Sequence, residues 1–144
     1  MDNIISSLKQ MQRMERLATN VYKQQIRSFK GTGTGKTMQA AFENEREHAG
    51  TLAKTLSRLS SSPSAAGFLF AFAGGVAGFV TPLLGKKTLF SIDGYIERMA
   101  VRDYKKFMEK NKYDLETITL LIRIIDDEKR HIENWRIAAE TLKK

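Results

Sequence analysis

The sequence contains no cysteine, only two prolines and no continuous apolar stretch near its start. Without cysteine the chain can form neither a disulfide nor a thiolate metal site. Because prolines are few and Glu, Lys, Arg, Leu, Met and Ala are abundant, the composition favours an all-α protein. We expect a single domain over residues 1–144. Since no signal peptide is recognisable at the N-terminus, we also expect a cytoplasmic location.

Acidic residues are outnumbered by basic ones, which gives a formal net charge of +8 and indicates an anionic partner. Lys and Arg are scattered along the chain and no nucleic-acid-binding motif is present, so we expect no nucleic acid. Residues 64–85 carry no charge, but five glycines and Pro82 interrupt them. This pattern favours a crossover helix over a transmembrane helix, with contact to a membrane surface through residues 64–87. Contact within a homo-oligomer would bury the same patch.

Four long segments show helical periodicity, over about residues 3–29, residues 37–59, a stretch ending near Lys110, and residues 114–142, with Asp114 as an N-cap. The first and third connections are short, so each pair of helices should form an antiparallel hairpin. The apolar segment is long enough to join one hairpin to the other. The sequence therefore predicts an antiparallel four-helix bundle with an apolar crossover between the second and third helices.

The glycine-rich stretch GTGTGKT, residues 31–37, resembles the phosphate-binding loop of nucleotide-binding proteins. That loop requires a glycine at position 30, where Lys30 stands, and it follows a strand rather than a helix. We interpret the stretch as a turn between two helices, with Thr37 as the N-cap of the second.

Glutamates occupy positions on the helix faces where hydrophobic residues are expected. A buried carboxylate without a partner is costly, so several that face one core require a shared cation. Both histidines of the chain lie three residues after such a glutamate. One Glu from each of two helices and Glu-x-x-His from each of the other two form the ligand set of di-iron and di-manganese bundles. The predicted metal ligands are Glu15, Glu45, His48, Glu97, Glu128 and His131.

The alternative interpretation places each of these glutamates on a solvated face and treats each histidine as an ordinary side chain. Three further positions are ambiguous. Asp93 lies one turn before Glu97 and is either a hydrogen-bond acceptor for a ligand or a helix-start residue. Tyr22 and Tyr104 each follow a predicted ligand by seven residues, a position more typical of core aromatic residues than of hydrogen-bonding groups. We retain Asp93 and Tyr104 as candidate catalytic residues.

Four stretches resemble the ligand regions of the demethoxyubiquinone hydroxylase family, a ferritin-like branch of di-iron monooxygenases in ubiquinone biosynthesis. They are ERLATNVYKQQ, ENEREH, TPLLGKKTLFSIDGYIERMAVRDY and DDEKRH. The resemblance covers about residues 12–140, and the T-x-L-L-G-K turn with its distance to Glu97 is its most specific part. The chain differs from the family at Asp103, where histidine is usual, and at residues 132–134, where the family is acidic and rich in histidine.

The resemblance implies a ferritin-like bundle that binds two iron ions, or manganese instead. It also implies that the protein activates O₂ to hydroxylate the ring of a polyprenyl quinone, with electrons from an external donor. A substrate of this kind would place the protein peripherally on the cytoplasmic face of a membrane. Two other functions remain open: a rubrerythrin-like peroxide or O₂ reductase, and a non-catalytic iron-binding helical module.

Overall fold

The computed structural model describes residues 2–142; Met1, Lys143 and Lys144 lie outside it. Over those residues the chain forms five α-helices, two short 3-10 helices and no strand, which confirms the all-α prediction. The elements in chain order are α1 (Asp2–Gln25), η1 (Ile26–Phe29), α2 (Gly33–Arg58), α3 (Gly67–Val80), η2 (Thr81–Leu84), α4 (Lys86–Lys110) and α5 (Leu115–Thr141).

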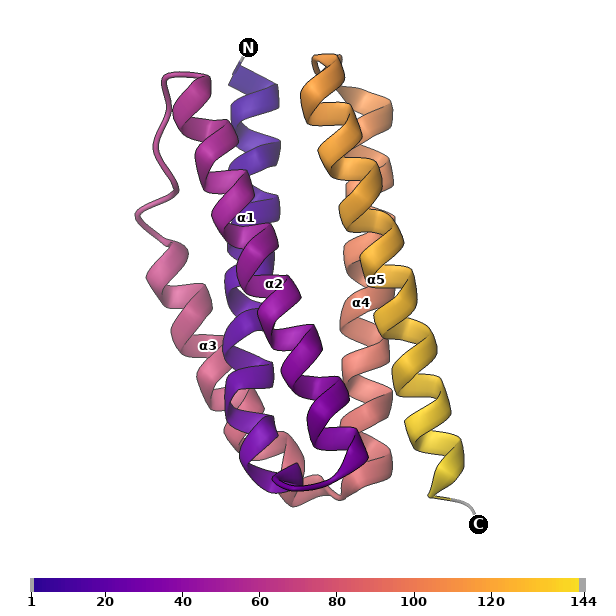
Figure 1. Ribbon diagram of the computed structural model, residues 1–144. Helices are drawn as coiled ribbons and strands as arrows, with labels where there is room; N and C mark the ends of the chain where they lie inside the picture. Colours follow the sequence, from indigo (N-terminus) through magenta and orange to yellow (C-terminus); the bar gives the residue numbers. More distant parts are fainter. Residues whose placement is uncertain (1, 143–144) are drawn as a thin grey trace.

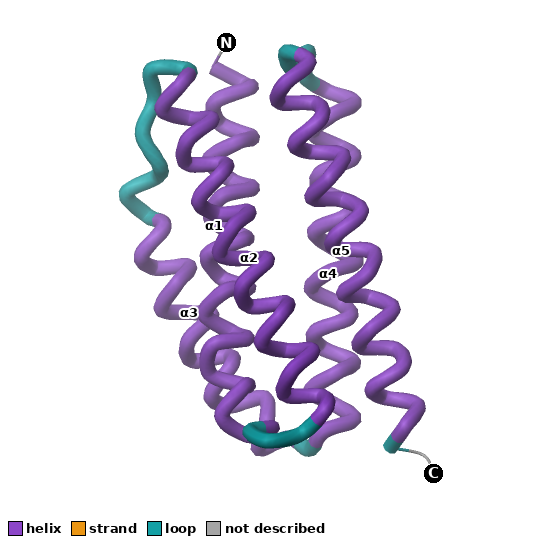
Figure 2. Tube along the Cα trace, in the orientation of Figure 1, coloured by secondary structure: helices purple, strands orange, loops and turns teal. Residues whose placement is uncertain are grey.

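The four long helices run side by side as two antiparallel hairpins, α1 with α2 and α4 with α5 (Figure 1). Contacts between α1 and α4 and between α2 and α5 join the hairpins. The shorter helix α3 lies outside these four helices and packs against α1, after the long loop that leaves α2 (Figure 2).

The interior contains two hydrophobic clusters, one toward each end of the long helices. On every long helix, the predicted metal ligands lie between the residues of one cluster and those of the other. The first cluster includes Leu8, Met11, Leu52, Leu56, Tyr104 and Leu121. The second includes Val21, Tyr22, Met38, Leu89, Phe90 and Trp135. A polar layer is thus enclosed by apolar side chains on both sides.

The starts of α2 and α5 test the two capping predictions. The prediction for Asp114 is confirmed, because its carboxylate accepts a hydrogen bond from the backbone N–H of Thr117 at 2.7 Å. The prediction for Thr37 is wrong. The cap is Thr32, whose hydroxyl accepts from the N–H of Gly35 at 3.0 Å. The helix consequently begins four residues earlier than predicted, at Gly33.

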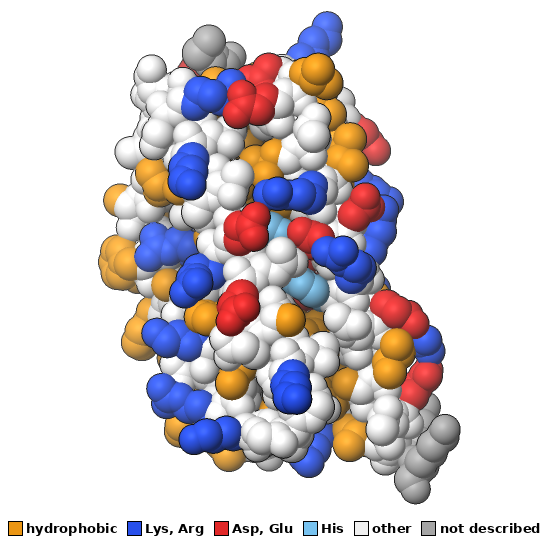
Figure 3. All heavy atoms as spheres, viewed as in Figure 1, with side chains coloured by type: hydrophobic (Ala, Val, Ile, Leu, Met, Phe, Trp, Pro, Cys, Tyr) orange, Lys and Arg blue, Asp and Glu red, His pale blue; other side chains and the backbone are white. Residues whose placement is uncertain are grey.

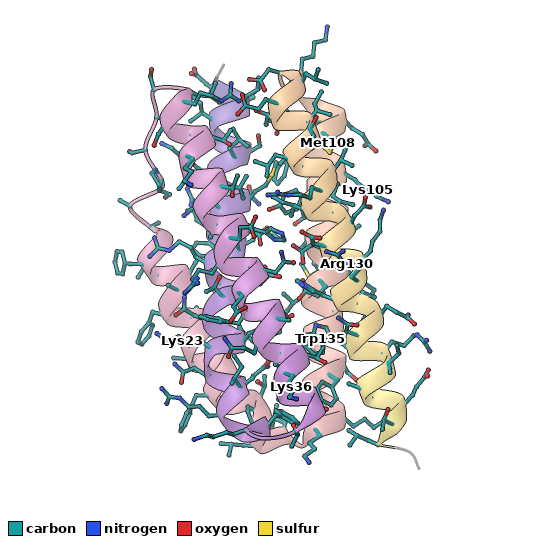
Figure 4. All side chains as sticks on the ribbon, in the orientation of Figure 1. Lys23, Lys36, Lys105, Met108, Arg130 and Trp135 are labelled. Carbon is teal, nitrogen blue, oxygen red and sulfur yellow. The ribbon has the colours of Figure 1, made fainter. Side chains whose placement is uncertain are left out.

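Glycine is required where the first turn of α2 packs against η1. A Cβ atom on Gly35 would lie 2.1 Å from the carbonyl oxygen of Phe29, far inside van der Waals contact. The glycine-rich stretch therefore serves a tight turn after a 3-10 helix, and its lysine, Lys36, is exposed on the start of α2 (Figure 4). No strand precedes it among the described residues.

The uncharged segment forms the expected crossover helix on the bundle. Gly74 and Gly78 face α1, where a Cβ on either would lie 2.2 Å from the carbonyl oxygen of Leu17 or Val21. This close approach leaves the other side of α3 uncovered, so Phe72 and Phe79 are exposed. The stretch Gly67–Leu84 has the length and composition of a membrane span, and only 22% of it is buried in the protein.

Candidate metal centre

The six predicted ligands converge in the polar layer. Each is between 0% and 5% exposed, so the interpretation that placed them on solvated faces is wrong. Burial follows from position, because each residue lies on the same helix face as the apolar residues one turn before and after it.

The six side chains form two overlapping groups, in each of which the potential ligand atoms lie within 4.8 Å of one another. The first group, hereafter the His48 position, contains Glu15, Glu45, His48 and Glu128. The second, hereafter the His131 position, contains Glu45, Glu97, Glu128 and His131. Glu45 and Glu128 belong to both, so the two positions share these two carboxylates.

Unpaired buried atoms show that the residues fit a metal. Four atoms of the His48 position are buried without a hydrogen-bond partner among the described residues: Glu15 Oε2, Glu45 Oε1, His48 Nδ1 and Glu128 Oε1. Orphaned polar atoms are rare in protein interiors because each is costly. A cation bound by all four would remove that cost. Oxygen and imidazole donors suit iron or manganese.

In the metal-free protein, protons partly balance the buried carboxylates. Burial alone would lower the pKa of His48, but the adjacent Glu128 and Glu15 carboxylates outweigh burial and raise this pKa to about 11. Burial and the charge of Glu128 raise the pKa of Glu97 to about 8, although His131 opposes the shift. Metal binding at neutral pH would therefore displace protons from this site.

Two tyrosines hold the terminal glutamates crosswise. Tyr22 on α1 donates a short hydrogen bond to Glu97 Oε1 on α4, and Tyr104 on α4 donates one to Glu15 Oε1 on α1. Burial, followed by the charge of the facing glutamate, raises the pKa of both tyrosines well above its usual value, so both remain donors. The interpretation of these residues as core aromatics without a polar role is wrong. Trp135, labelled in Figure 4, adds a hydrogen bond from Nε1 to the Tyr22 hydroxyl at 3.0 Å.

Asp127 is a functional candidate that sequence reasoning missed. Its Oδ2 lies 2.9 Å from His48 Nε2, the ring nitrogen that faces away from the metal position. When Nδ1 is free to bind a metal, Nε2 carries the proton and donates to this carboxylate, which fixes the orientation of the ring. Arg130 and Asn44 also donate to Asp127. The sequence signal for Asp127 is its position directly before Glu128. Consecutive residues of a helix point in different directions, so Asp127 points away from the core stripe and toward α2.

Asp93 lies two turns inside α4, so its interpretation as a helix-start residue is wrong. It is fully buried, and its Oδ1 accepts from Gln25 Nε2 at 2.8 Å rather than from any of the six ligands. Gln25 also donates to Thr81 at 3.0 Å, which ties the end of the crossover to the core. Burial raises the pKa of Asp93 to about 7 against the opposing hydrogen bond from Gln25.

Two hollows reach the metal centre from different sides. An apolar pocket of about 180 Å³ lies between α1, α3 and α4; it is lined by Glu15, Glu45 and Glu97 together with Met14, Leu17, Phe70, Ile96 and Met99. A more open, polar hollow lies between α2 and α5, where His131, Asn44 and Arg130 line it. Figure 3 shows histidine atoms on this face among acidic and basic side chains.

One comparison with known proteins is informative. A family model described as "Ubiquinone biosynthesis protein COQ7" matches residues 6–141, nearly the whole chain. No curated protein matches it. The matched region contains both hairpins, the crossover helix and all six ligands of the metal centre.

Proposed function

The chain belongs to the ubiquinone biosynthesis protein COQ7 family, and we propose that it is a ferritin-like di-iron hydroxylase acting on the ring of a polyprenyl quinone. The observation that carries the proposal is the pair of overlapping ligand groups that share Glu45 and Glu128 in the centre of the bundle. Two carboxylates common to both groups favour two ions held together rather than one structural ion.

Iron bound at these positions would supply the activation of O₂, which protein side chains cannot provide. The chain itself supplies geometry. Glu45 and Glu128 hold the two positions together, while Tyr104 and Tyr22 fix the orientation of the terminal carboxylates Glu15 and Glu97. In the overall change, a ring C–H bond and O₂ become a ring C–OH and water, which consumes two electrons and two protons. The electrons come from an external donor.

The apolar pocket is the proposed place of the quinone ring. It touches three of the ligand glutamates, and its remaining walls are almost entirely hydrocarbon. Such a pocket excludes water and favours a flat, lipophilic ring over a small polar substrate. Phe70 of α3 forms part of the wall, so the crossover helix separates the pocket from the outside of the bundle.

The uncovered side of α3 is the proposed membrane contact. Phe68, Phe72, Phe79 and Leu83 are each more than half exposed, and no acidic residue occurs between residues 60 and 92. Lys86 and Lys87 follow the segment, and basic side chains accompany hydrophobic ones along this edge (Figure 3). Apolar burial together with attraction to anionic headgroups would hold the protein at a bilayer, from which a polyprenyl quinone reaches the pocket.

The test is single-turnover oxidation with labelled oxygen. Protein loaded anaerobically with Fe(II) and mixed with a short-chain quinone should, on exposure to ¹⁸O₂, yield a hydroxylated ring that contains one ¹⁸O atom. A Glu45→Ala variant serves as the control and should yield none. If the loaded protein instead consumes peroxide rapidly and leaves every quinone unchanged, the hydroxylase proposal is wrong and a rubrerythrin-like reductase replaces it.

A further inference from the structure

The two hairpins place corresponding residues around the centre, and this correspondence fails directly before the two shared glutamates. Glu15 and Tyr22 on α1 correspond to Glu97 and Tyr104 on α4, and the tyrosines make equivalent crosswise contacts. On α2 and α5 the bridging glutamates are preceded by different residues, Asn44 and Asp127.

That difference changes what supports each histidine. Asp127 accepts a hydrogen bond from the outer nitrogen of His48. The residue in the equivalent place, Asn44, donates to Asp127 Oδ2 at 3.3 Å instead. The carboxylates that lie within 4 Å of His131 are all ligands, and all approach its inner nitrogen, Nδ1. The outer nitrogen of His131 therefore has no carboxylate among residues 2–142 to orient it.

A further observation distinguishes the positions. His48 is fully buried, whereas His131 is slightly exposed and lines the polar hollow between α2 and α5. The His48 position is thus closed and has an oriented histidine, whereas the His131 position is open to solvent.

We infer that Asp127 makes the two metal positions unequal: the His48 position binds its ion first and more tightly, and the His131 position exchanges its ion through the hollow between α2 and α5. This inference rests on the proposed metal centre. A carboxylate that orients a ligating histidine typically changes metal affinity by about 10- to 100-fold, so a separation of that size is expected.

Titration of metal-free protein with Mn²⁺, with free Mn²⁺ followed by electron paramagnetic resonance, tests the inference. Wild type should bind two equivalents whose dissociation constants differ by about 10-fold or more. His131→Ala should retain the tighter equivalent, and His48→Ala only the weaker one. Two equivalents of equal affinity, or a tight equivalent retained by His48→Ala, would overturn the inference while leaving the proposed metal centre intact. Absence of any bound metal would overturn both.

A swap variant guards against effects of misfolding. Asn44→Asp combined with Asp127→Asn conserves the charge and moves the orienting carboxylate from His48 to His131. The order of affinities should then reverse, so that adding His48→Ala to the swap retains the tighter equivalent. Circular dichroism confirms helical content in each variant. A swap that folds and keeps the original order would show that Asp127 is not the cause, and would overturn the inference.

Discussion

The hairpin of α1 and α2 and the hairpin of α4 and α5 give the same ligand types to one centre but surround them differently. Trp135 lies four residues after His131 and donates to Tyr22, whereas the residue four positions after His48 is Leu52. Four residues before Glu97 stands Asp93, and four before Glu15 stands Met11. The first hairpin in turn carries the crossover helix, which packs on α1.

The comparison shows which features the metal centre requires and which it tolerates. Every residue of the two ligand groups has an equivalent in the other hairpin, as the proposed pair of metal positions requires. Apart from the two tyrosines, the residues that surround the ligands differ, because their neighbours differ: a polar surface hollow lies beside α5 and an apolar helix beside α1. Changes at shared ligands should therefore affect both positions, and changes in the surrounding layer only one.

The largest effect is expected from Glu45→Ala, because this carboxylate belongs to both positions. Metal content, measured by plasma emission spectrometry, should fall from two ions per chain to below one, and hydroxylation should be lost. Glu15→Ala, which affects one position, should leave about one ion. Glu47→Ala on the same helix is the matched control, since among residues 2–142 its exposed side chain pairs only with Arg123 and its removal should cost neither metal nor activity. Equal metal loss in Glu45→Ala and Glu47→Ala would refute the assignment.

The next largest effect concerns the hairpin that carries α3. Phe72→Asp combined with Phe79→Asp should abolish sedimentation with anionic liposomes, because it places two charges where hydrocarbon contact is proposed. Wild-type binding should weaken as salt is added. Leu115→Asp on α5 changes an equally exposed apolar residue and should leave liposome binding unchanged. Normal binding by the double variant would mean that α3 contacts something other than a bilayer, such as a second copy of the chain.

Much of this arrangement could be predicted from the sequence, because ligands on an apolar stripe stand out against their neighbours. Asp127 and Asn44 could not be found that way, since they lie beside the stripe and act across two helices. The crosswise partners of Tyr22 and Tyr104 depend on helix register, which spacing within one helix does not reveal. The cap of α2 is Thr32, next to the close approach of Gly35 to the carbonyl of Phe29. N-cap preferences of single residues do not reveal that contact.

A stability effect of intermediate size is expected at Asp93, which has no acidic counterpart on α1. Its pKa is about 7 in the folded protein but about 3.9 in an unfolded chain. Between these values the folded state holds the extra proton, so stability falls as pH rises. Asp93→Asn removes this dependence. Urea denaturation should show the variant to be more stable than wild type by a few kcal/mol above pH 7, with the difference vanishing near pH 4. A difference that grows toward low pH would contradict this account.

Smaller, position-specific effects should follow from the tyrosines. Tyr104→Phe leaves Glu15 without its donor and should weaken Mn²⁺ binding about 10-fold at the His48 position alone. Tyr22→Phe should do the same at the His131 position. Trp135→Phe, which removes the donor to Tyr22 but keeps an aromatic ring, should have a weaker effect confined to the His131 position. If either tyrosine variant weakens both positions equally, the crosswise hydrogen bonds do not act separately on the two ions.

The smallest effect is expected at Lys36, at the start of α2. Its side chain is exposed, so Lys36→Ala should change unfolding free energy by no more than about 0.5 kcal/mol and leave metal content unchanged. Gly35→Ala, one residue earlier, should cost about 1–3 kcal/mol, because its Cβ would collide with the Phe29 carbonyl and force the turn open. A phosphate-binding loop would behave in the opposite way, since its lysine contacts the nucleotide. If fluorescent ATP binds the wild type but does not bind Lys36→Ala, the assignment of this stretch as a helix-capping turn is therefore wrong.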